Sequence, residues 1–194
     1  MTRRTPSTAA RGFSLVEVMI ALIIISVGML GIAKLEAVVL SNTSTSRVRA
    51  LVALQAASLA DTMHADRDFW NGASGDWTTN PLTVTATIVS GSATLAATNS
   101  STLSTALGSG TDCTTASCSP VSLAGYDVNQ WATDFSSVIK NSTSTVTCSS
   151  ASGAVTCTIQ IQWSESTAAA NQQEAAQGAP TAFQTQTYTL VVEP

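Results

Sequence analysis

The hydrophobic pattern changes once along the chain, from one long apolar run near the N-terminus to alternating apolar and polar positions in the C-terminal half. Glu17 is the only charged residue between positions 13 and 33. A helix needs about 20 apolar residues to cross a bilayer, so this run is long enough to span one. Residues 13–33 are therefore predicted to form a membrane-spanning helix.

The helix is expected to continue past the membrane span to about residue 65. No proline occurs between positions 13 and 65, and the only glycines there are Gly28 and Gly31. Several later apolar residues recur at spacings that place them on one helical face: Val48, Leu51, Val52, Leu59 and Met63. We expect residues 34–66 to be the helical spine of an extracytoplasmic domain that continues over residues 67–194.

Strict alternation predicts four strands in that domain, each with one buried face. They lie around Thr83–Ile88, Val146–Cys148, Val155–Trp163 and Thr187–Val192. Small and polar residues at 149–153 suit a hairpin turn between the second and the third. A long helix packed against a small antiparallel sheet is an α+β fold.

The remaining segments predict a short helix and two loops. Asp127 and Gln130 have the spacing of a capping box. The apolar face of the helix that follows is expected to comprise Val128, Trp131, Phe135 and Val138. Segments 93–115 and 166–178 are rich in Ser, Thr, Ala and Gln, which predicts exposed loops with little core of their own.

The N-terminal junction limits how the apolar run can be interpreted. A secretory signal peptide has an apolar core of about 7–15 residues before a small-residue cleavage site, and this core is longer and lacks such a site. A plain membrane anchor accounts for the length and for the arginines ahead of it, which favour a cytoplasmic N-terminus. It does not account for Glu17, because a carboxylate within a membrane span is costly.

The stretch Gly12-Phe13-Ser14-Leu15-Val16-Glu17-Val18 resembles the prepilin motif of type IV pilins and type II secretion pseudopilins. In those families a prepilin peptidase cuts after the glycine and methylates the new N-terminal phenylalanine. The glutamate then pairs with the terminal amine of a neighbouring subunit. The resemblance implies that residues 1–12 are a removed leader, that Phe13 becomes the methylated terminus and that Glu17 makes the pair. It also implies a type IV pilin-like fold.

Four later parts of the chain also follow a family pattern, namely Arg47–Ala50, Leu54–Asp66, Trp131 and Ile159–Trp163. They resemble the PilV family of type IV pilus modification proteins, which implies a non-catalytic minor pilin. Such a protein takes part in pilus assembly or priming, in adhesion and in twitching motility, and it contacts minor and major pilins through its N-terminal helix. It would sit in the inner membrane with a periplasmic domain, and later in the pilus at the cell surface.

Other roles stay open. A minor pseudopilin of a type II secretion system shares the N-terminal motif, and an adhesin-like binding module could use the same helix as an anchor. A major pilin is disfavoured, because such pilins usually carry a proline in the helix beyond the span.

The charge balance argues against nucleic-acid binding. The chain has 8 basic and 12 acidic residues, a net charge of −4. Removal of a leader that contains Arg3, Arg4 and Arg11 leaves 5 basic against 12 acidic residues and a net charge of −7. Binding to nucleic acid would require a basic face.

Four cysteines favour an oxidising compartment, and three disulfide connectivities are possible. We favour Cys113–Cys118, which closes a tight loop, and Cys148–Cys157, which joins the two strands of the predicted hairpin. A zinc site is the alternative, but the spacing is poor for one, with a single distant histidine. Free buried thiols are the third possibility.

No catalytic, cofactor or metal site is predicted. His64, Asp66 and Asp68 are expected to form the solvated end of the spine helix. No nucleophile elbow of the G-x-S-x-G type and no phosphate-binding glycine loop occurs.

Overall fold

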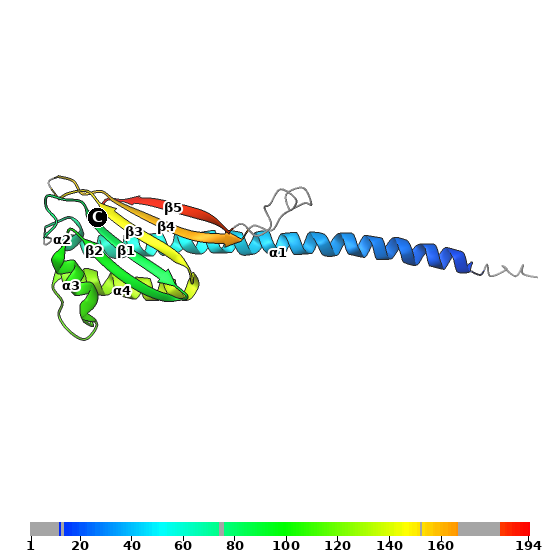
Figure 1. Cartoon of the computed structure of the whole chain (residues 1–194), viewed down its shortest axis with the longest axis horizontal. Coiled ribbons are helices and arrows are strands. Elements are labelled where there is room, and N and C mark those ends of the chain that lie inside the picture. The colour runs from blue at the N-terminus through cyan, green and yellow to red at the C-terminus, as the bar shows by residue number, and fades with distance from the viewer. Residues whose placement is uncertain (1–11, 13, 74–75, 152, 167–182) are drawn as a thin grey trace, which may run out of the picture. The chain divides into compact units, whose positions relative to one another are not determined.

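The computed structural model describes residues 12, 14–73, 76–151, 153–166 and 183–194. The chain divides into two compact units, residues 1–43 and residues 44–194, and each is described by itself. The elements in chain order are α1 (Leu15–Ala65), α2 (Arg67–Trp70), β1 (Leu82–Val89), β2 (Ser92–Thr98), α3 (Ser101–Ser109), α4 (Pro120–Val138), β3 (Ser142–Cys148), β4 (Cys157–Ser166) and β5 (Phe183–Val192), as labelled in Figure 1.

The N-terminal unit is helical from Leu15 onward. Its segment Leu15–Glu36 is long and apolar enough to cross a membrane, and its side chains are exposed. Hydroxyl groups on this half of α1 bond to the helix itself: Ser26 Oγ donates to the Leu22 carbonyl at 2.7 Å and Thr43 Oγ1 donates to the Val39 carbonyl at 2.8 Å. Such internal bonding keeps polar groups satisfied in an apolar environment.

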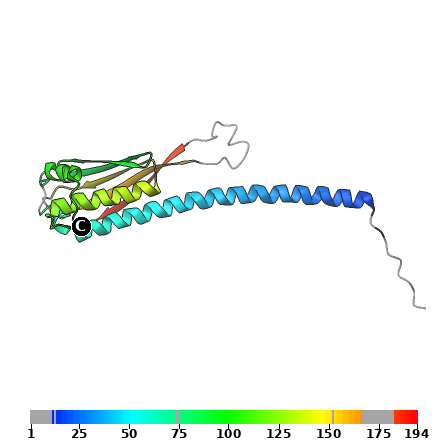
Figure 2. The ribbon, with the colours of Figure 1, turned by 90° about the horizontal axis from the view of Figure 1, so that it is seen from below.

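The second half of α1 buries one face in the core of the C-terminal unit. Val52, Ala56, Leu59 and Met63 recur every three or four residues and are all buried. They belong to one hydrophobic cluster with the inward-facing residues of the sheet. The figures show residues 44–65 and α4 on the same face of the sheet (Figures 1 and 2). This layering is the predicted α+β, pilin-like arrangement.

The sheet is antiparallel, with strand order β2-β1-β3-β4-β5. β1, β3, β4 and β5 correspond to the four predicted strands. β2 was not predicted, because it lies at the edge of the sheet with mostly exposed side chains and so shows little apolar alternation. Its two-residue turn from β1 uses Ser90 and Gly91, both with positive φ (53° and 82°), as favoured hairpin turns do.

The prediction of a loop over 93–115 is wrong, since most of β2 and all of α3 lie in it. α3 buries Leu103 and Leu107 and is capped by Ser100, whose side chain accepts from the Leu103 amide at 3.1 Å. Asp76 also accepts from the Ser101 and Thr102 amides, at 2.8 and 3.1 Å. Because Asp76 lies in a loop 25 positions before Ser101, its two contacts with the start of α3 are not evident in the local sequence of the helix. The other predicted loop, 166–178, lies outside the described residues beyond Ser166, which belongs to β4.

The predicted start of the second helix at Asp127 is also wrong. α4 begins at Pro120 with Ser119 as its N-cap, and the Ser119 side chain accepts from the Ser122 amide at 3.4 Å. Proline suits the first helical position because its missing N–H would have no partner there. Of the predicted apolar face, Val128, Trp131 and Phe135 are buried, whereas Val138 at the helix end is exposed.

α3 and α4 approach closely at Gly125. A Cβ there would lie 2.7 Å from the Cβ of Ala106 and 3.0 Å from its carbonyl carbon. Asn129 strengthens the contact, because its Nδ2 donates to the Leu107 carbonyl at 3.0 Å and to the Gly125 carbonyl at 2.8 Å. The missing side chain at Gly125 therefore sets the spacing of the two helices.

Gly125→Ala should lower the free energy of unfolding by about 1–3 kcal/mol, because the added methyl group overpacks a contact made by backbone atoms. Gly108→Ala in α3 is the matched control: its Cβ meets nothing within 4 Å, so stability should stay unchanged or rise by up to about 1 kcal/mol. Urea titration of the oxidised full-length chain in detergent measures both. Equal stability of the two variants would contradict the close approach.

Candidate functional site

The N-terminal motif lies at the start of α1. Gly12 precedes the helix and is exposed, whereas Phe13 lies outside the described residues. Glu17 is in the first helical turn, and its amide donates to the Ser14 carbonyl at 3.0 Å. The Glu17 side chain is exposed, and among the residues described the only ion pair joins Arg49 to Glu165. Glu17 thus has no cationic partner within that part of its own chain.

The surface around Glu17 is apolar. The exposed large hydrophobic residues of this segment lie on all sides of the helix and include Leu15, Val16, Val18, Met19, Ile20, Leu22, Ile23, Ile24 and Ile25. An exposed apolar surface of this size indicates contact with lipid or with another protein. In either environment a single carboxylate is costly unless a cation is supplied from outside the described part of the chain.

Both disulfides have the pairing favoured by the sequence. Cys113 and Cys118 close a loop ahead of α4, with Cα atoms 5.6 Å apart. Cys148 and Cys157 join β3 to β4 at the first pair of their register, with Cα atoms 3.9 Å apart. No cysteine is left free, and no cluster of three metal-ligating residues occurs among the described residues.

The prediction of a solvated helix end is wrong for Asp66. Its neighbours His64 and Asp68 are exposed, but Asp66 is only 5% exposed and its Oδ2 has no hydrogen-bond partner in the described structure. Burial, together with the nearby carboxylates of Asp127 and Asp68, raises the pKa of Asp66 to about 7. Burial also raises the pKa of Asp127. The cause is tertiary, because the corner between α1 and α2 brings Asp66 close to α4.

An ion pair joins β4 to α1. Arg49 donates from Nε to Glu165 Oε1 at 3.1 Å and from Nη2 to Oε2 at 2.8 Å, and Trp163 Nε1 donates to Oε1 at 2.9 Å. Glu165 is 6% exposed, and the Arg49 guanidinium holds its pKa below the usual range. The partners lie 116 positions apart in sequence, so sequence reasoning did not find the pair.

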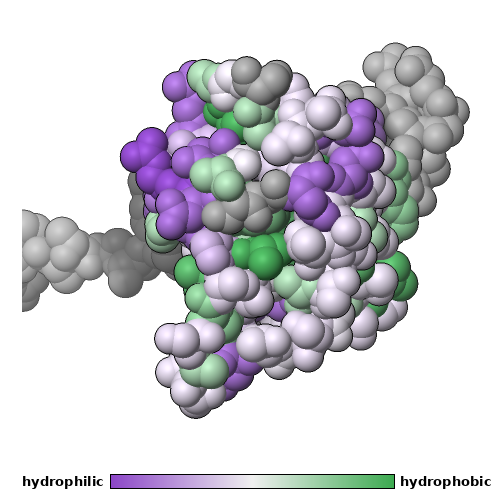
Figure 3. Space-filling model, turned by 90° about the vertical axis from the view of Figure 1, so that its left-hand side faces the viewer, coloured by the Kyte–Doolittle hydropathy of each residue, from purple (hydrophilic) through white to green (hydrophobic). Residues whose placement is uncertain are grey.

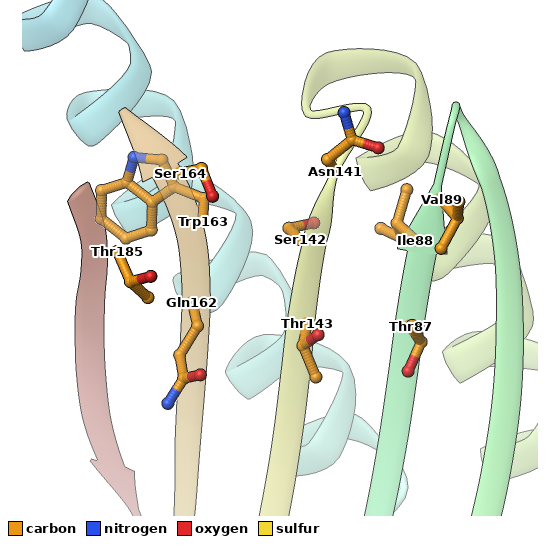
Figure 4. A pocket seen from close by; sticks show the side chains of 10 residues that line it. All are labelled: Thr87, Ile88, Val89, Asn141, Ser142, Thr143, Gln162, Trp163, Ser164 and Thr185. Carbon is orange, nitrogen blue, oxygen red and sulfur yellow. The ribbon is translucent and has the colours of Figure 1, made fainter. Parts of the chain in front are cut away.

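Several pockets lie on the described surface. One of about 320 Å³ lies at the end of the sheet and has no ionisable residue in its lining, as Figure 4 shows for Asn141, Gln162 and Thr185 among others. Ser142 Oγ in its wall is buried without a hydrogen-bond partner in the described structure. The space-filling view shows mostly weakly polar residues, with hydrophilic ones on both sides of the view and a small hydrophobic group between them (Figure 3).

Comparison with known proteins gives one match. The family model described as the prokaryotic N-terminal methylation motif matches residues 7–33. The match supports a type IV pilin-like or pseudopilin-like substrate of prepilin peptidase, and proteins with this motif are in general structural and not catalytic. The searches of curated proteins and of solved structures each found no significant match.

Asp66 should make the domain less stable as the pH rises. Its folded pKa of about 7 lies above an unfolded value of about 3.9, so its contribution is complete below pH 4 and is lost as the pH rises through 7. Asp66→Asn mimics the protonated acid and should remove most of the decline in the free energy of unfolding between pH 5 and 8, while the raised pKa of Asp127 accounts for the decline that remains. At pH 8 the variant should be more stable than the wild type.

The matched control is Asp61→Asn, an exposed position on the same helix, which should leave the slope unchanged. Urea titrations at pH 5, 6, 7 and 8 measure all three proteins. A variant at Asp66 that is less stable than the wild type at pH 8 would show that the ionised carboxylate is stabilising.

Proposed function

We propose that this chain is a minor pilin of a type IV filament, processed after Gly12 and assembled through the first half of α1. One observation carries the proposal: the N-terminal methylation motif at residues 7–33 coincides with an apolar, exposed helix that has one unpaired carboxylate in its first turn. Before assembly the chain would be anchored in the inner membrane with its domain in the periplasm. Afterwards it would be part of the pilus.

Cleavage after Gly12 would supply the missing cation. It creates a terminal amine on Phe13, which the peptidase would then methylate. The Glu17 carboxylate of this chain would form an ion pair with the terminal amine of a neighbouring subunit inside the apolar filament core. An isolated buried carboxylate is strongly unfavourable there, so the pairing selects the subunit register more than it adds stability.

The role within the filament is proposed to be that of a PilV-like protein, in assembly or priming and in modification of pilus function. Two features favour a minor over a major pilin: the similarity of Arg47–Ala50 and Leu54–Asp66 to PilV proteins, and the absence of proline from α1. Other pilins and the peptidase would be its partners. No catalytic role is proposed.

Gly12→Ala should block removal of the leader, because the peptidase of this class cuts after glycine. The intact mass of the membrane-extracted protein should then include residues 1–12, and the filament fraction should contain at least tenfold less of the chain. Intact-mass spectrometry and quantitative immunoblotting of sheared filaments measure the two effects. Normal incorporation of the uncut precursor would instead favour an anchored binding module.

Glu17→Ala separates assembly from anchoring. The variant should still be cleaved and inserted, but its filament-associated fraction should fall at least tenfold, which corresponds to about 1.4 kcal/mol of lost register selectivity. Glu36→Ala, an exposed carboxylate at the other end of the same apolar segment, is the matched control and should be incorporated normally. Equal incorporation of both variants would remove Glu17 from the assembly mechanism.

A further inference from the structure

The two edges of the sheet differ. β2 has seven residues and contacts α3 and α4, which lie beside it. β5 has ten residues, and among the residues that the structure describes it pairs with β4 alone. β5 therefore borders the sheet on its open side, where Figures 1 and 2 show no further described strand or helix continuing the sheet.

The register shows which backbone groups of β5 point outward. The Ser149 amide donates to the Thr156 carbonyl at 2.9 Å, which makes that pair a hydrogen-bonded one in the β3–β4 register. Hydrogen-bonded and non-hydrogen-bonded pairs alternate in antiparallel sheets. The even-numbered residues of β4 therefore bond to β3, and its odd-numbered residues bond to β5.

The same alternation carries over to β5. Ile161 pairs with Tyr188 and Ile159 with Leu190, so the even-numbered residues of β5 bond to β4. The 3.9 Å between the Cα atoms of Cys148 and Cys157 agrees with this phase, because the non-hydrogen-bonded pairs are the close ones. The outward backbone groups of β5 belong to Thr185, Thr187, Thr189 and Val191.

These outward groups form an accessible row. Among the residues that the structure describes, none of their amides or carbonyls has a hydrogen-bond partner. Phe183 and Val191 near the two ends of the strand are 73% and 61% exposed. A row of unpaired amides and carbonyls is a template for the addition of another strand.

β5 also lacks the features by which proteins protect such edges. Charged residues, proline and bulges usually block strand addition. The sequence of β5, Phe183-Gln-Thr-Gln-Thr-Tyr-Thr-Leu-Val-Val192, contains no charged residue and no proline, and its register with β4 is unbroken. The chain after cleavage would carry a net charge of −7 from 5 basic and 12 acidic residues, so the uncharged edge is a place where an uncharged strand can approach without facing an unpaired charge.

We propose that β5 takes up an extended, uncharged strand of another subunit in the same filament, held by main-chain hydrogen bonds to Thr185, Thr187, Thr189 and Val191. This proposal rests on the assembly role proposed above. It assigns a lateral contact to the globular unit that is separate from the helix packing around Glu17. The sheet would then continue from one subunit into the next.

Thr187→Pro tests the main-chain contact, because it removes one outward amide and leaves the bonds to β4 in place. Thr187→Lys tests it by placing a charge at the edge. Thr187→Val keeps the backbone and is the matched control. The first two variants should be cleaved after Gly12 but enter filaments at least tenfold less than the wild type, whereas Thr187→Val should enter normally.

Urea titration of each cleaved variant in detergent shows whether the domain is folded. If Thr187→Pro is unstable, the test rests on the folded Thr187→Lys variant alone. Normal incorporation of folded Thr187→Pro and Thr187→Lys would overturn the strand-addition proposal and leave the assembly role intact. Failure of the wild type itself to be cleaved or incorporated would instead overturn the assembly role.

Residue-resolved hydrogen exchange of the cleaved wild-type chain in detergent provides a second readout. The amides of Thr185, Thr187 and Thr189 should exchange at least tenfold faster than those of Tyr188 and Leu190, and this difference should disappear in filaments. Slow exchange of the odd-numbered amides in the dilute chain would show that the edge is already covered and would overturn the proposal. Protection that arises only with increasing concentration of this chain alone would assign the edge to a second copy, which also overturns it.

Discussion

The structure depends on the burial of one face of α1 beneath the sheet. Val52, Ala56, Leu59 and Met63 supply an apolar stripe against which the inward side chains of the strands pack. The sheet is too small to form a core alone, and α4 adds Val128, Trp131 and Phe135 on the same side. Trp131 links the layers directly, because its Nε1 donates to the Gln55 carbonyl of α1 at 2.8 Å.

Polar contacts also fix the position of the strands relative to the second half of α1. The Arg49 guanidinium contacts both oxygens of Glu165 and so positions the end of β4 against α1. At the far end of the domain, Arg67 donates to the Pro194 carbonyl at 3.3 Å and joins the chain terminus to the corner between α1 and α2. The two contacts lie at opposite ends of the same helix-to-sheet layer. The buried carboxyl of Asp66 adds a proton-dependent element close to the second.

The features that could be predicted from sequence are those with a local periodic signal. Four strands followed from strict alternation, and the long helix followed from the absence of proline together with a 3.6-residue period. α3 could not be predicted in this way, because its start depends on Asp76, 25 positions before Ser101. β2 lacked a signal since little of it is buried. The capping-box prediction at Asp127 failed because a better start exists at Ser119-Pro120, where a hydroxyl cap and a proline coincide. The burial of Asp66 depends on α4, more than 50 positions later in the chain, so no local pattern could reveal it.

The two disulfides have a consequence for the order of folding. Each joins cysteines that are near in sequence, separated by 5 and by 9 positions. Closing a short loop costs less chain entropy than closing a long one, so encounters between neighbouring cysteines are the most frequent in an unfolded chain. An oxidising compartment would therefore lead the unfolded chain to the native connectivity by proximity. Covalent closure of the β3–β4 hairpin would then precede the pairing of β5, and the strand at the open side of the sheet would be added last.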